Sequence, residues 1–257
     1  MSASADLVEV FSSVQGEGTH VGERTIFVRF GGCDLRCRWC DSPHTWRPSL
    51  ECRLETPGGG SASVPNPVDL GTVLGAVRDL GASQHRFVSL TGGEPLLQPE
   101  AACEFARALR ALGPRILLET HGAAPDAFRA VVDAVDVVSM DWKLASEVRR
   151  ASDPAKGPVR GFEAEHRLFL EIARTAPETV LKLVVTLAST DEEIDAALAA
   201  VKEIHPAAVV VFQPVAPGGG AARSPTARRL LDLASRGASL GLDVRVIPQL
   251  HKLLGVR

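Results

Sequence analysis

The sequence lacks long hydrophobic runs, and it lacks an excess of positive charge. No apolar stretch approaches the roughly 18 residues of a membrane-spanning helix, and Met1 to Asp6 lack the basic and apolar regions of a secretion signal. We therefore expect a cytoplasmic protein without membrane contact. Lys and Arg number 28 against 31 Asp and Glu, so the net charge of -3 gives no electrostatic footprint for nucleic acid. A small-molecule partner is expected instead.

Cysteine is scarce as well. The five cysteines are an odd number, which disfavours a scaffold of disulfides, and in a reducing compartment such cysteines favour metal or redox chemistry. Cys103 lies at a helical position and is expected to be a small buried hydrophobe. With 257 residues, 45% of them hydrophobic, the chain is long enough to bury a large core, which excludes disorder.

Short β-branched runs alternate with helical patterns, which is typical of a parallel sheet built from strand-helix units. The expected strands are residues 7–11, 25–30, 87–91, 115–120, 135–140, 180–186, 208–213 and 243–247. Asp69 and Ser224-Pro225 look like helix starts. This pattern and the chain length predict an α/β fold, either a complete or a partial α/β barrel.

In such a barrel the chemistry lies at the C-terminal ends of the strands, and polar residues follow the expected strands at six places. These are Cys33, Gly92-Gly93-Glu94, Glu119, Asp141 with Lys143, Lys182, and Gln213-Pro214. Lys182 fits less well because it is centred in an apolar run. It either reaches the barrel interior or occupies an edge position with a solvated amine.

Two segments interrupt the alternation, although neither indicates a domain boundary, and we expect one domain over residues 1–257. Residues 48–67 are rich in Gly, Ser and Pro and predict a flexible surface loop, in which Cys52 has no assigned role. Residues 146–160 form a polar insertion that we expect to be a solvated excursion.

The strongest motif is a triplet of thiols, Cys33, Cys37 and Cys40, spaced four and three positions apart in a loop that leaves a strand. Three thiolates so close can converge on one metal centre. A four-iron cluster normally has four cysteine ligands, so a triplet leaves one iron free to bind another molecule. The alternative is a structural zinc ion with His44 as the fourth ligand.

The spacing Cys-x3-Cys-x2-Cys resembles that of the radical S-adenosylmethionine (SAM) enzymes. The resemblance implies a partial (β/α)6-type barrel with N- and C-terminal extensions, in which the cysteines hold a 4Fe-4S cluster and SAM chelates the free iron. One-electron reduction then cleaves SAM to methionine and a 5'-deoxyadenosyl radical. Thr91-Gly92-Gly93-Glu94-Pro95 looks like the motif that meets the methionine amino group in that family.

The run Phe11 to Gly18, Arg29 and Cys40-Asp41-Ser42 narrow the resemblance to one family of radical SAM enzymes, the 7-carboxy-7-deazaguanine synthases. These convert 6-carboxy-5,6,7,8-tetrahydropterin to 7-carboxy-7-deazaguanine with loss of ammonia, in queuosine and deazapurine biosynthesis. By resemblance, the pterin contacts are Gln15, Glu17, Arg29, Thr91 and His251. A planar guanidinium such as that of Arg29 suits the substrate carboxylate.

The same resemblance assigns the remaining site residues. Asp41 and Ser42 match an Asp-Thr pair that helps to hold Mg2+, with serine in place of the usual threonine, and hard oxygen ligands are what Mg2+ selects. The cofactor pocket for SAM would comprise Gly92, Gly93, Glu94, Glu119, Ser139, Lys143 and Gln213. No protein side chain is assigned the chemical step, because the adenosyl radical performs it.

The resemblance also implies partners, namely an electron donor such as flavodoxin or ferredoxin and a second copy in a homodimer. Two other functions stay open from the sequence. One is a glycyl-radical enzyme activase, which shares the cysteine triplet but acts on a partner protein. The other is a non-catalytic zinc-binding module.

Overall fold

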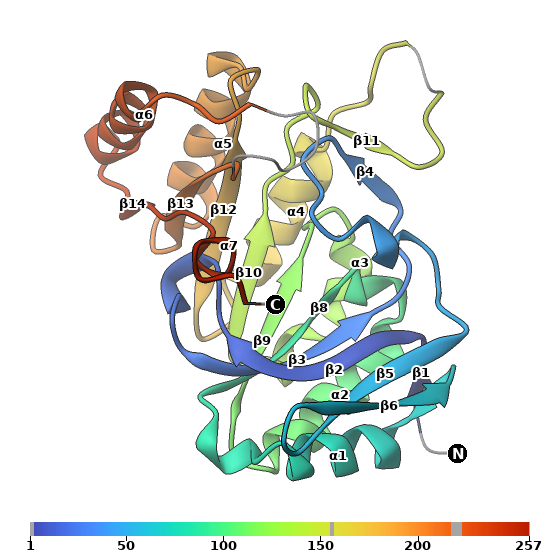
Figure 1. The fold of residues 1–257 in the computed structure, drawn as a ribbon. Coiled ribbons are helices and arrows are strands. Elements are labelled where there is room, and N and C mark those ends of the chain that lie inside the picture. Colours follow the sequence, from blue (N-terminus) through green and yellow to red (C-terminus); the bar gives the residue numbers. More distant parts are fainter. Residues whose placement is uncertain (1–2, 155–156, 217–222, 257) are drawn as a thin grey trace.

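Strands and helices alternate along the chain in the computed structural model, which describes residues 3–154, 157–216 and 223–256 (Figure 1). The strands are β1 Ser4–Ala5, β2 Leu7–Val14, β3 Arg24–Phe30, β4 Leu35–Cys37, β5 Glu51–Thr56, β6 Gly60–Pro65, β7 Val68–Asp69, β8 Phe87–Gly92, β9 Arg115–Thr120, β10 Val137–Asp141, β11 Val148–Arg150, β12 Thr179–Val185, β13 Val209–Pro214 and β14 Val244–Val246. The helices are α1 Leu70–Asp79, α2 Pro99–Arg110, α3 Pro125–Arg129, α4 Glu163–Ala173, α5 Asp191–Ile204, α6 Ala227–Ser239 and α7 Leu250–Leu254. Short 3-10 turns are η1 Gly18–His20, η2 Pro43–Trp46, η3 Ala82–Gln84, η4 Pro95–Leu97 and η5 Val132–Ala134.

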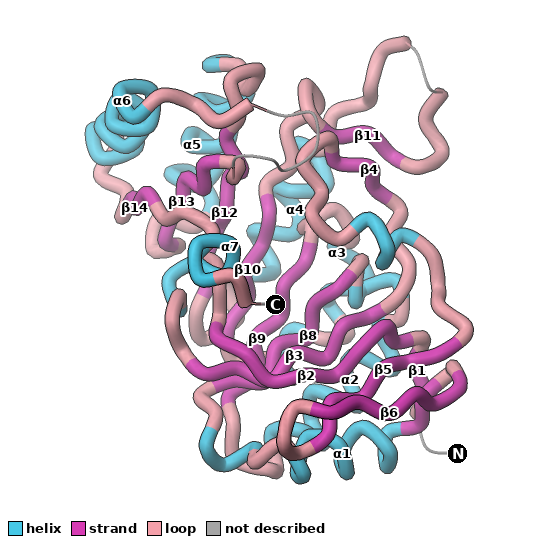
Figure 2. Tube along the Cα trace, viewed as in Figure 1, coloured by secondary structure: helices cyan, strands magenta, loops and turns pink. Residues whose placement is uncertain are grey.

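One sheet of ten strands organises the molecule, in the order β14-β13-β12-β10-β9-β8-β3-β2-β5-β6. From β3 to β14 every neighbouring pair is parallel, whereas β2 runs antiparallel to β3. In the described residues its end strands β14 and β6 do not pair with each other, so the predicted partial barrel is confirmed. Figure 2 shows the curved sheet with α7 on its open side, opposite the helices that link the strands.

The pleat of each strand separates core residues from site residues. Successive side chains of a strand point to opposite faces. Leu181 and Leu183 of β12 belong to the core cluster between sheet and helices, so Lys182 between them points into the barrel. Phe87, Leu117 and Val137 form a separate apolar cluster near the starts of β8, β9 and β10, which gives the barrel a floor.

The two expected helix starts have different outcomes. The carboxylate of Asp69 accepts a hydrogen bond from the Thr72 amide at 3.0 Å, so this residue caps α1 as predicted. The second prediction is wrong by two residues, because Thr226 caps α6 and its hydroxyl accepts from the Arg229 amide at 3.2 Å. The helices in the described ranges are too short or too polar to cross a membrane.

The prediction of a flexible loop over residues 48–67 is wrong for residues 51–65, which form the hairpin β5–β6. Gly58 and Gly59 have φ values of +88° and +87°, and they make the turn that other residues adopt only under strain. β5 also pairs in parallel with β2, which brings Cys52 into the core with none of its surface exposed. The Gly, Ser and Pro content hid the alternation of buried and exposed residues along β5.

The insertion at 146–160 is also not wholly a solvated excursion. β11 pairs antiparallel with β4, the strand that carries Cys37. Residues 155–156 of the insertion lie outside the described residues.

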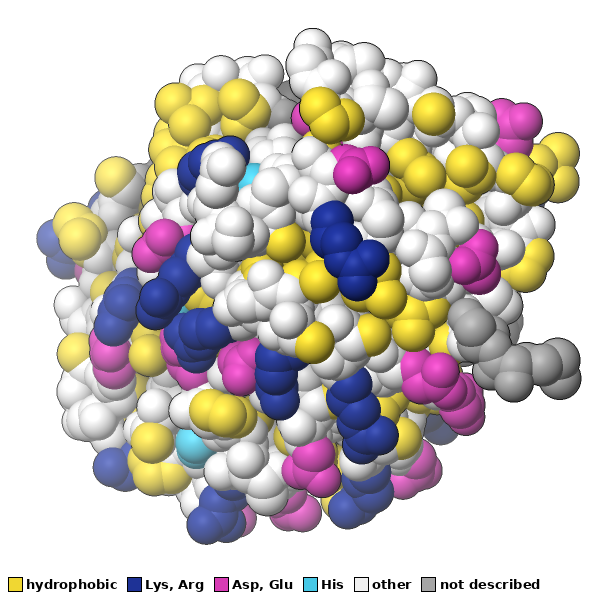
Figure 3. All heavy atoms as spheres, turned by 90° about the horizontal axis from the view of Figure 1, so that it is seen from below, with side chains coloured by type: hydrophobic (Ala, Val, Ile, Leu, Met, Phe, Trp, Pro, Cys, Tyr) yellow, Lys and Arg dark blue, Asp and Glu magenta, His cyan; other side chains and the backbone are white. Residues whose placement is uncertain are grey.

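The acidic and basic side chains on the face that carries α1 are interspersed, as Figure 3 shows from below. A single domain over the whole chain stays a prediction.

Candidate active site

The three thiols of the predicted triplet line one cavity at the C-terminal ends of the barrel strands. Cys33 follows β3, Cys37 ends β4, and the amide of Cys40 donates to the Cys37 carbonyl at 3.2 Å. The Gly32 amide donates to the Thr45 carbonyl at 2.8 Å, which closes the loop around the thiols. All three cysteines are free thiols, and this arrangement can hold a metal centre.

The thiols are too widely spread for one zinc ion. Four ligands at about 2.3 Å from a zinc ion would lie within about 4 Å of one another. Among the described residues, one set of three possible ligand atoms lies within 4.8 Å of one another, and it consists of atoms of Glu17, Asp41 and His251. The three thiols do not form such a set. His44 is exposed and does not line the cavity, so nothing in the geometry supports the zinc alternative.

Burial controls the protonation of these thiols. It raises the pKa of Cys33 to about 12 and that of Cys37 to about 11, although the nearby Lys143 ammonium lowers both. Without a metal centre these thiols therefore stay protonated, and they lose their protons only when they bind one, because metal ligation requires the thiolate. The donor set and the shared cavity therefore fit a sulfur-ligated iron cluster.

Two glycines let the turn after β8 pack closely against the backbone of β3 and of the cysteine loop. A Cβ atom on Gly93 would lie 2.0 Å from the carbonyl oxygen of Gly32, and one on Gly92 would lie 2.3 Å from that of Phe30. Gly92 also has a φ of +118°. The predicted Gly-Gly turn, which we call the glycine cradle, therefore lies against the cysteine loop with no room for a side chain.

Glu94 is the only predicted site residue that does not line the cavity. Its carboxylate is fully buried and accepts hydrogen bonds from the Leu96 amide at 3.0 Å, the Thr120 hydroxyl at 2.8 Å and the His121 amide at 2.8 Å. These bonds join the turn after β8 to the end of β9. A contact between Glu94 and a ligand stays a prediction, whereas its bracing of the glycine turn is observed.

Glu119 and Gln213 offer acceptor oxygens on the inner face of β9 and β13. Glu119 Oε1 accepts from the Ser89 hydroxyl at 2.6 Å and from the Gln15 amide nitrogen at 3.0 Å, so its position is fixed. Gln213 is 2% exposed, and its Oε1 has no hydrogen-bond partner among the described residues. An orphaned buried acceptor costs free energy unless a ligand supplies a donor.

A buried network of alternating charges lies between these oxygens and the thiols. Asp141 Oδ2 accepts from the Lys143 ammonium at 2.5 Å, and its Oδ1 lies 3.0 Å from the Lys182 nitrogen. Lys182 also pairs with Glu17. Burial opposes the charged state of Lys182, but Asp141 and Glu17 raise its pKa well above the ordinary value. The Lys143 ammonium lies 4.6 Å from the ring centre of Trp39, above one wall of the cavity.

Arg29 presents a fixed guanidinium on the inner face of β3. Its Nε donates to Glu9 Oε1 at 3.0 Å, and its carbon Cζ lies 5.3 Å from the ring centre of Phe11. Glu9 also accepts from Arg53 at 2.5 Å. The Arg29 side chain is 16% exposed, so a carboxylate in the cavity would meet it with little competition from water.

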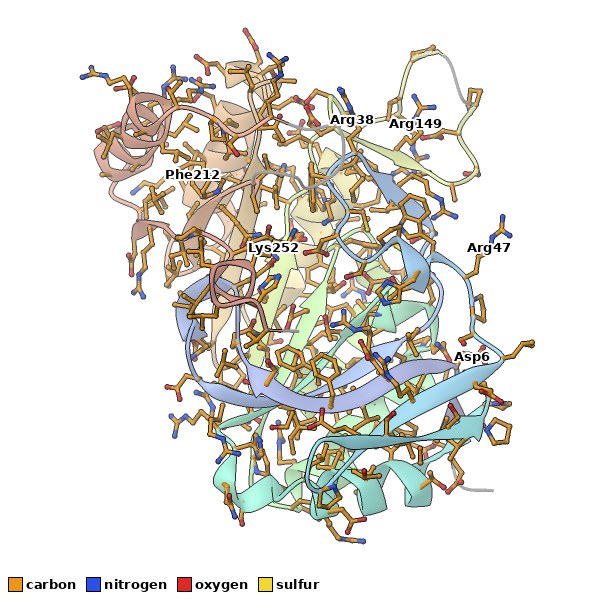
Figure 4. The ribbon with its side chains drawn as sticks, viewed as in Figure 1. Asp6, Arg38, Arg47, Arg149, Phe212 and Lys252 are labelled. Carbon is orange, nitrogen blue, oxygen red and sulfur yellow. The ribbon has the colours of Figure 1, made fainter. Side chains whose placement is uncertain are left out.

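The C-terminal segment closes the site from the open side of the barrel. The Gln249 amide nitrogen donates to Glu17 Oε1 at 2.6 Å and to Asp41 Oδ2 at 3.1 Å. Lys252 Nζ, labelled in Figure 4, lies 3.3 Å from Asp41 Oδ2, and His251 Nε2 lies 3.7 Å from it. Although burial opposes it, the nearby His251 imidazole and the Lys252 charge lower the pKa of Asp41.

Oxygen donors for a cation gather at the same place. Ligand atoms of Glu17, Asp41 and His251 lie within 4.8 Å of one another, and the Ser42 hydroxyl donates to Asp41 Oδ1 at 3.0 Å. The carboxylates fit the hard-oxygen preference of Mg2+. Gly16 is pressed against this group, because a Cβ there would lie 2.0 Å from His251 Nδ1.

All the other predicted site residues line the cavity: Gln15, Glu17, Arg29, Asp41, Ser42, Thr91, Gly92, Gly93, Glu119, Ser139, Lys143, Gln213 and His251, together with the three cysteines. The cavity is also lined by residues for which the sequence predicted no role in the site, among them Trp39, Asp141, Lys182 and Gln249. Lys182 could have been found from the sequence, because it is a charged residue between Leu181 and Leu183 in an apolar strand. No local signal marks Gln249.

Comparisons with known proteins agree with this geometry. A family model described as the Radical SAM superfamily matches residues 27–201. The chain is 36% identical to a protein named 7-carboxy-7-deazaguanine synthase of Geobacter sulfurreducens, over 98% of this chain and 97% of that protein. It is 38% identical to a protein of the same name from Methanopyrus kandleri, over 97% and 93%. The crystal structure of QueE from Escherichia coli has the same fold, with a TM-score of 0.60, 19% identity and coverage of 95% and 93%.

Proposed function

The chain belongs to the radical SAM superfamily and, within it, to the family of 7-carboxy-7-deazaguanine synthases, and from this premise we propose its reaction and the roles of its residues. It converts 6-carboxy-5,6,7,8-tetrahydropterin to 7-carboxy-7-deazaguanine and releases ammonia. One observation carries the proposal: the three thiols and the Arg29 guanidinium line the same cavity. A radical source and an anchor for a small carboxylate would thus share one cavity.

Cys33, Cys37 and Cys40 would hold the 4Fe-4S cluster, which leaves one iron for SAM. When bound, the cluster and SAM supply the 5'-deoxyadenosyl radical that removes a hydrogen atom from C6 of the pterin. Gly92 and Gly93 bring backbone amides and carbonyls close to the methionine part. The protein's contribution is placement, since a reactive radical selects its target only through position.

The acceptors on β9 and β13 suit the adenosyl part of SAM. Glu119 is held by Ser89 and Gln15 with its second oxygen available for the ribose hydroxyls. The unpartnered Gln213 oxygen accepts from an N–H donor of the cofactor. Ser139 and Lys143 line the same cavity and would complete the cofactor contacts.

The substrate lies between Arg29 and the Glu17 end of the cavity. Arg29 binds the carboxylate in a charge-assisted pair, and Glu9 fixes the guanidinium from behind. Glu17, with Gln15 beside it, accepts from the N–H groups of the pterin ring. Thr91 and His251 complete the contacts by their position on the cavity wall.

Mg2+ is part of the proposal. Asp41 and Ser42 hold it, and Glu17 and His251 lie close enough to contribute. The cation would neutralise charge where the substrate's own oxygens meet Asp41. The electron donor, flavodoxin or ferredoxin, a homodimeric state and a cytoplasmic location belong to the proposal as well, supported by the family resemblance and the free thiols.

The test is an anaerobic assay of the reconstituted protein. About four iron and four sulfide per chain are expected. With 6-carboxy-5,6,7,8-tetrahydropterin, SAM, Mg2+ and dithionite, the product should have the mass of 7-carboxy-7-deazaguanine, with one ammonia per product. SAM should be regenerated rather than consumed, because 5'-deoxyadenosine returns the hydrogen atom.

Other outcomes would contradict the proposal in recognisable ways. Colourless protein with one zinc ion per chain would instead support the alternative of a non-catalytic zinc-binding module. A loaded cluster that consumes SAM and leaves the pterin unchanged would favour the glycyl-radical activase. The triple variant C33A/C37A/C40A is the control, since it should bind no iron cluster while it keeps Arg29 and the cavity wall.

A further inference from the structure

Two arginines face each other across the short ladder that joins the cysteine loop to the polar insertion. Arg36 of β4 is the direct partner of Arg149 of β11. Like charges directly opposite each other on neighbouring strands destabilise the pair. The structure thus retains an unfavourable arrangement beside the predicted cluster.

Further arginines extend this surface. Arg38 is exposed and follows β4, and its amide donates to the Glu147 carbonyl at 3.1 Å. The Arg36 guanidinium lies 4.7 Å from the ring centre of Trp46, and Arg47, the next residue, is exposed. Figure 4 shows Arg38 and Arg149 beside the paired strands β4 and β11, and Arg47 farther down the same side of the molecule, beyond η2. All three side chains are directed away from the barrel. We call Arg36, Arg38, Arg47 and Arg149 the arginine surface.

No carboxylate within the described residues neutralises this surface at 4.0 Å or less. The nearby acids have other partners. Asp34 pairs with His121 at 2.9 Å, and Glu165 pairs with Arg150 and Arg160. Among the described residues, Arg149 donates to one backbone carbonyl, that of Pro154, at 2.8 Å. The positive charge of the surface is therefore uncompensated, although the whole chain carries -3.

The pleat places this charge directly behind a cluster ligand. Alternate residues of a strand point to opposite faces, and Cys37 lines the cavity. Arg36 and Arg38 flank it in sequence and therefore point outward. Arg36 Nη1 also donates to the Cys33 carbonyl at 2.8 Å, so the surface contacts the cysteine loop itself. The backbone of β4 therefore separates the side chains of Arg36 and Arg38 from the thiol of Cys37.

We propose that the arginine surface docks an acidic one-electron carrier protein, which reduces the cluster through β4. The inference rests on the proposed function only in requiring a cluster on the three cysteines. In the step, the carrier loses one electron and the cluster gains it, and no bond or proton is exchanged. A protein carrier fits better than a nucleic acid, because the charge is confined to one small surface of an otherwise net-negative chain.

The experiment compares R38E/R149E with the parent holoenzyme. Arg36 is left in place because it contacts the cysteine loop. Affinity for oxidised flavodoxin, an acidic carrier, is measured by calorimetry, and cluster reduction by reduced flavodoxin is followed by absorbance without pterin. The variant should bind flavodoxin at least tenfold more weakly and be reduced correspondingly more slowly at low carrier concentration. Binding to the parent should weaken as salt rises.

Two controls keep the outcomes distinct. R78E reverses an exposed charge on α1, at the end of the molecule opposite β4 (Figure 1), and should bind flavodoxin within twofold of the parent. Reduction by dithionite should be unchanged in R38E/R149E. Equal losses with both reductants would indicate a damaged cluster loop and overturn the proposal, as would an unchanged affinity for flavodoxin. If the pterin is not converted by dithionite-reduced parent, the proposed function fails while the docking result stands.

Discussion

The Lys182 nitrogen lies 3.0 Å from Asp141 Oδ1 and also pairs with Glu17, so one buried ammonium joins β12, β10 and the N-terminal segment. The side chain of Lys182 is only 8% exposed. Burial by itself would lower the pKa of a lysine there, but the two carboxylates raise it well above the ordinary value and keep the side chain charged. Because Glu17 is proposed to meet the pterin, Lys182 couples the barrel interior to the substrate contacts.

Replacing Lys182 by methionine should therefore destabilise the fold. Methionine keeps most of the side-chain volume but removes the ammonium that pairs with both carboxylates. Glu17 then keeps its hydrogen bond from Gln249, and Asp141 keeps its ion pair with Lys143. Removal of one member of a buried ion pair costs about 3–5 kcal/mol. Urea unfolding should show this loss. K202M, at an exposed position of α5, should stay within about 0.5 kcal/mol of the parent, and an equally stable K182M would refute the role of the ion pair.

Arg29→Ala should impair substrate binding and leave the cluster intact. A charge-assisted hydrogen bond contributes about 1.5–3 kcal/mol, which corresponds to a rise in KM of roughly 10- to 150-fold with unchanged iron content. Glu9→Gln should raise KM by a smaller factor, because it weakens the contact that orients Arg29. Steady-state kinetics with dithionite as reductant measures both.

Arg53 provides the matched control for that series. It is the other partner of Glu9, but its side chain is 52% exposed and it does not line the cavity. Arg53→Ala should therefore change KM by no more than about threefold, within the range of exposed ion pairs. Normal turnover of Arg29→Ala at low substrate, after cluster loading is verified, would remove Arg29 from the site.

The barrel was predictable because its strands are buried apolar runs with a strong periodic signal. The strand expected at 115–120 is β9 to the residue, and that at 25–30 differs from β3 by one residue. The hairpin β5–β6 was missed because half of it is exposed and built from Gly, Ser and Pro. Its stability comes from pairing with β2, a tertiary contact that local composition does not encode.

The site was predictable in position but not in side-chain direction. Motifs indicated which residues reach the cavity, and Glu94 shows the limit. The residue occurs where the motif requires, but its carboxylate accepts three hydrogen bonds within the protein. Gln249 could not be found at all, since it is 232 positions from Glu17 and meets it only through the fold.

His166 should make the protein less stable in weak acid. Burial between Trp142 and Phe162 lowers its pKa to about 3, against 6.5 in the unfolded chain. The unfolded state therefore binds one more proton between those values, so stability is full above pH 6.5 and falls as pH decreases toward 3. Between pH 7 and pH 5 this histidine should account for a loss of about 2 kcal/mol.

The measurement is urea unfolding of the protein without its cluster, so that acid release of iron does not contribute. His166→Gln removes the titrating group, and the loss between pH 7 and pH 5 should shrink by about 2 kcal/mol relative to the parent. His44→Gln is the control, because that histidine is exposed and should leave the pH dependence unchanged. An identical pH dependence in His166→Gln would show that His166 is protonated in the folded state.

Gly93→Ala should disable the site through a single methyl group. The added carbon would lie 2.0 Å from the Gly32 carbonyl oxygen and 2.9 Å from that of Thr45, and both are backbone atoms that cannot rotate away. The cysteine loop and the turn after β8 must then separate. We expect a loss of stability of about 1–3 kcal/mol or more and cluster loading below that of the parent.

Gly75→Ala is the matched substitution, since a Cβ there meets nothing within 4 Å in the interior of α1. It should stabilise the protein by about 0.5–1 kcal/mol, because alanine favours the helix and restricts the unfolded chain. If urea unfolding shows that Gly93→Ala destabilises the protein and Gly75→Ala stabilises it, and iron content falls only in Gly93→Ala, then the close approach of the two backbones is the cause. If Gly93→Ala loads a full cluster and binds SAM normally, the glycine cradle is not required, and the cofactor must approach the thiols from another side.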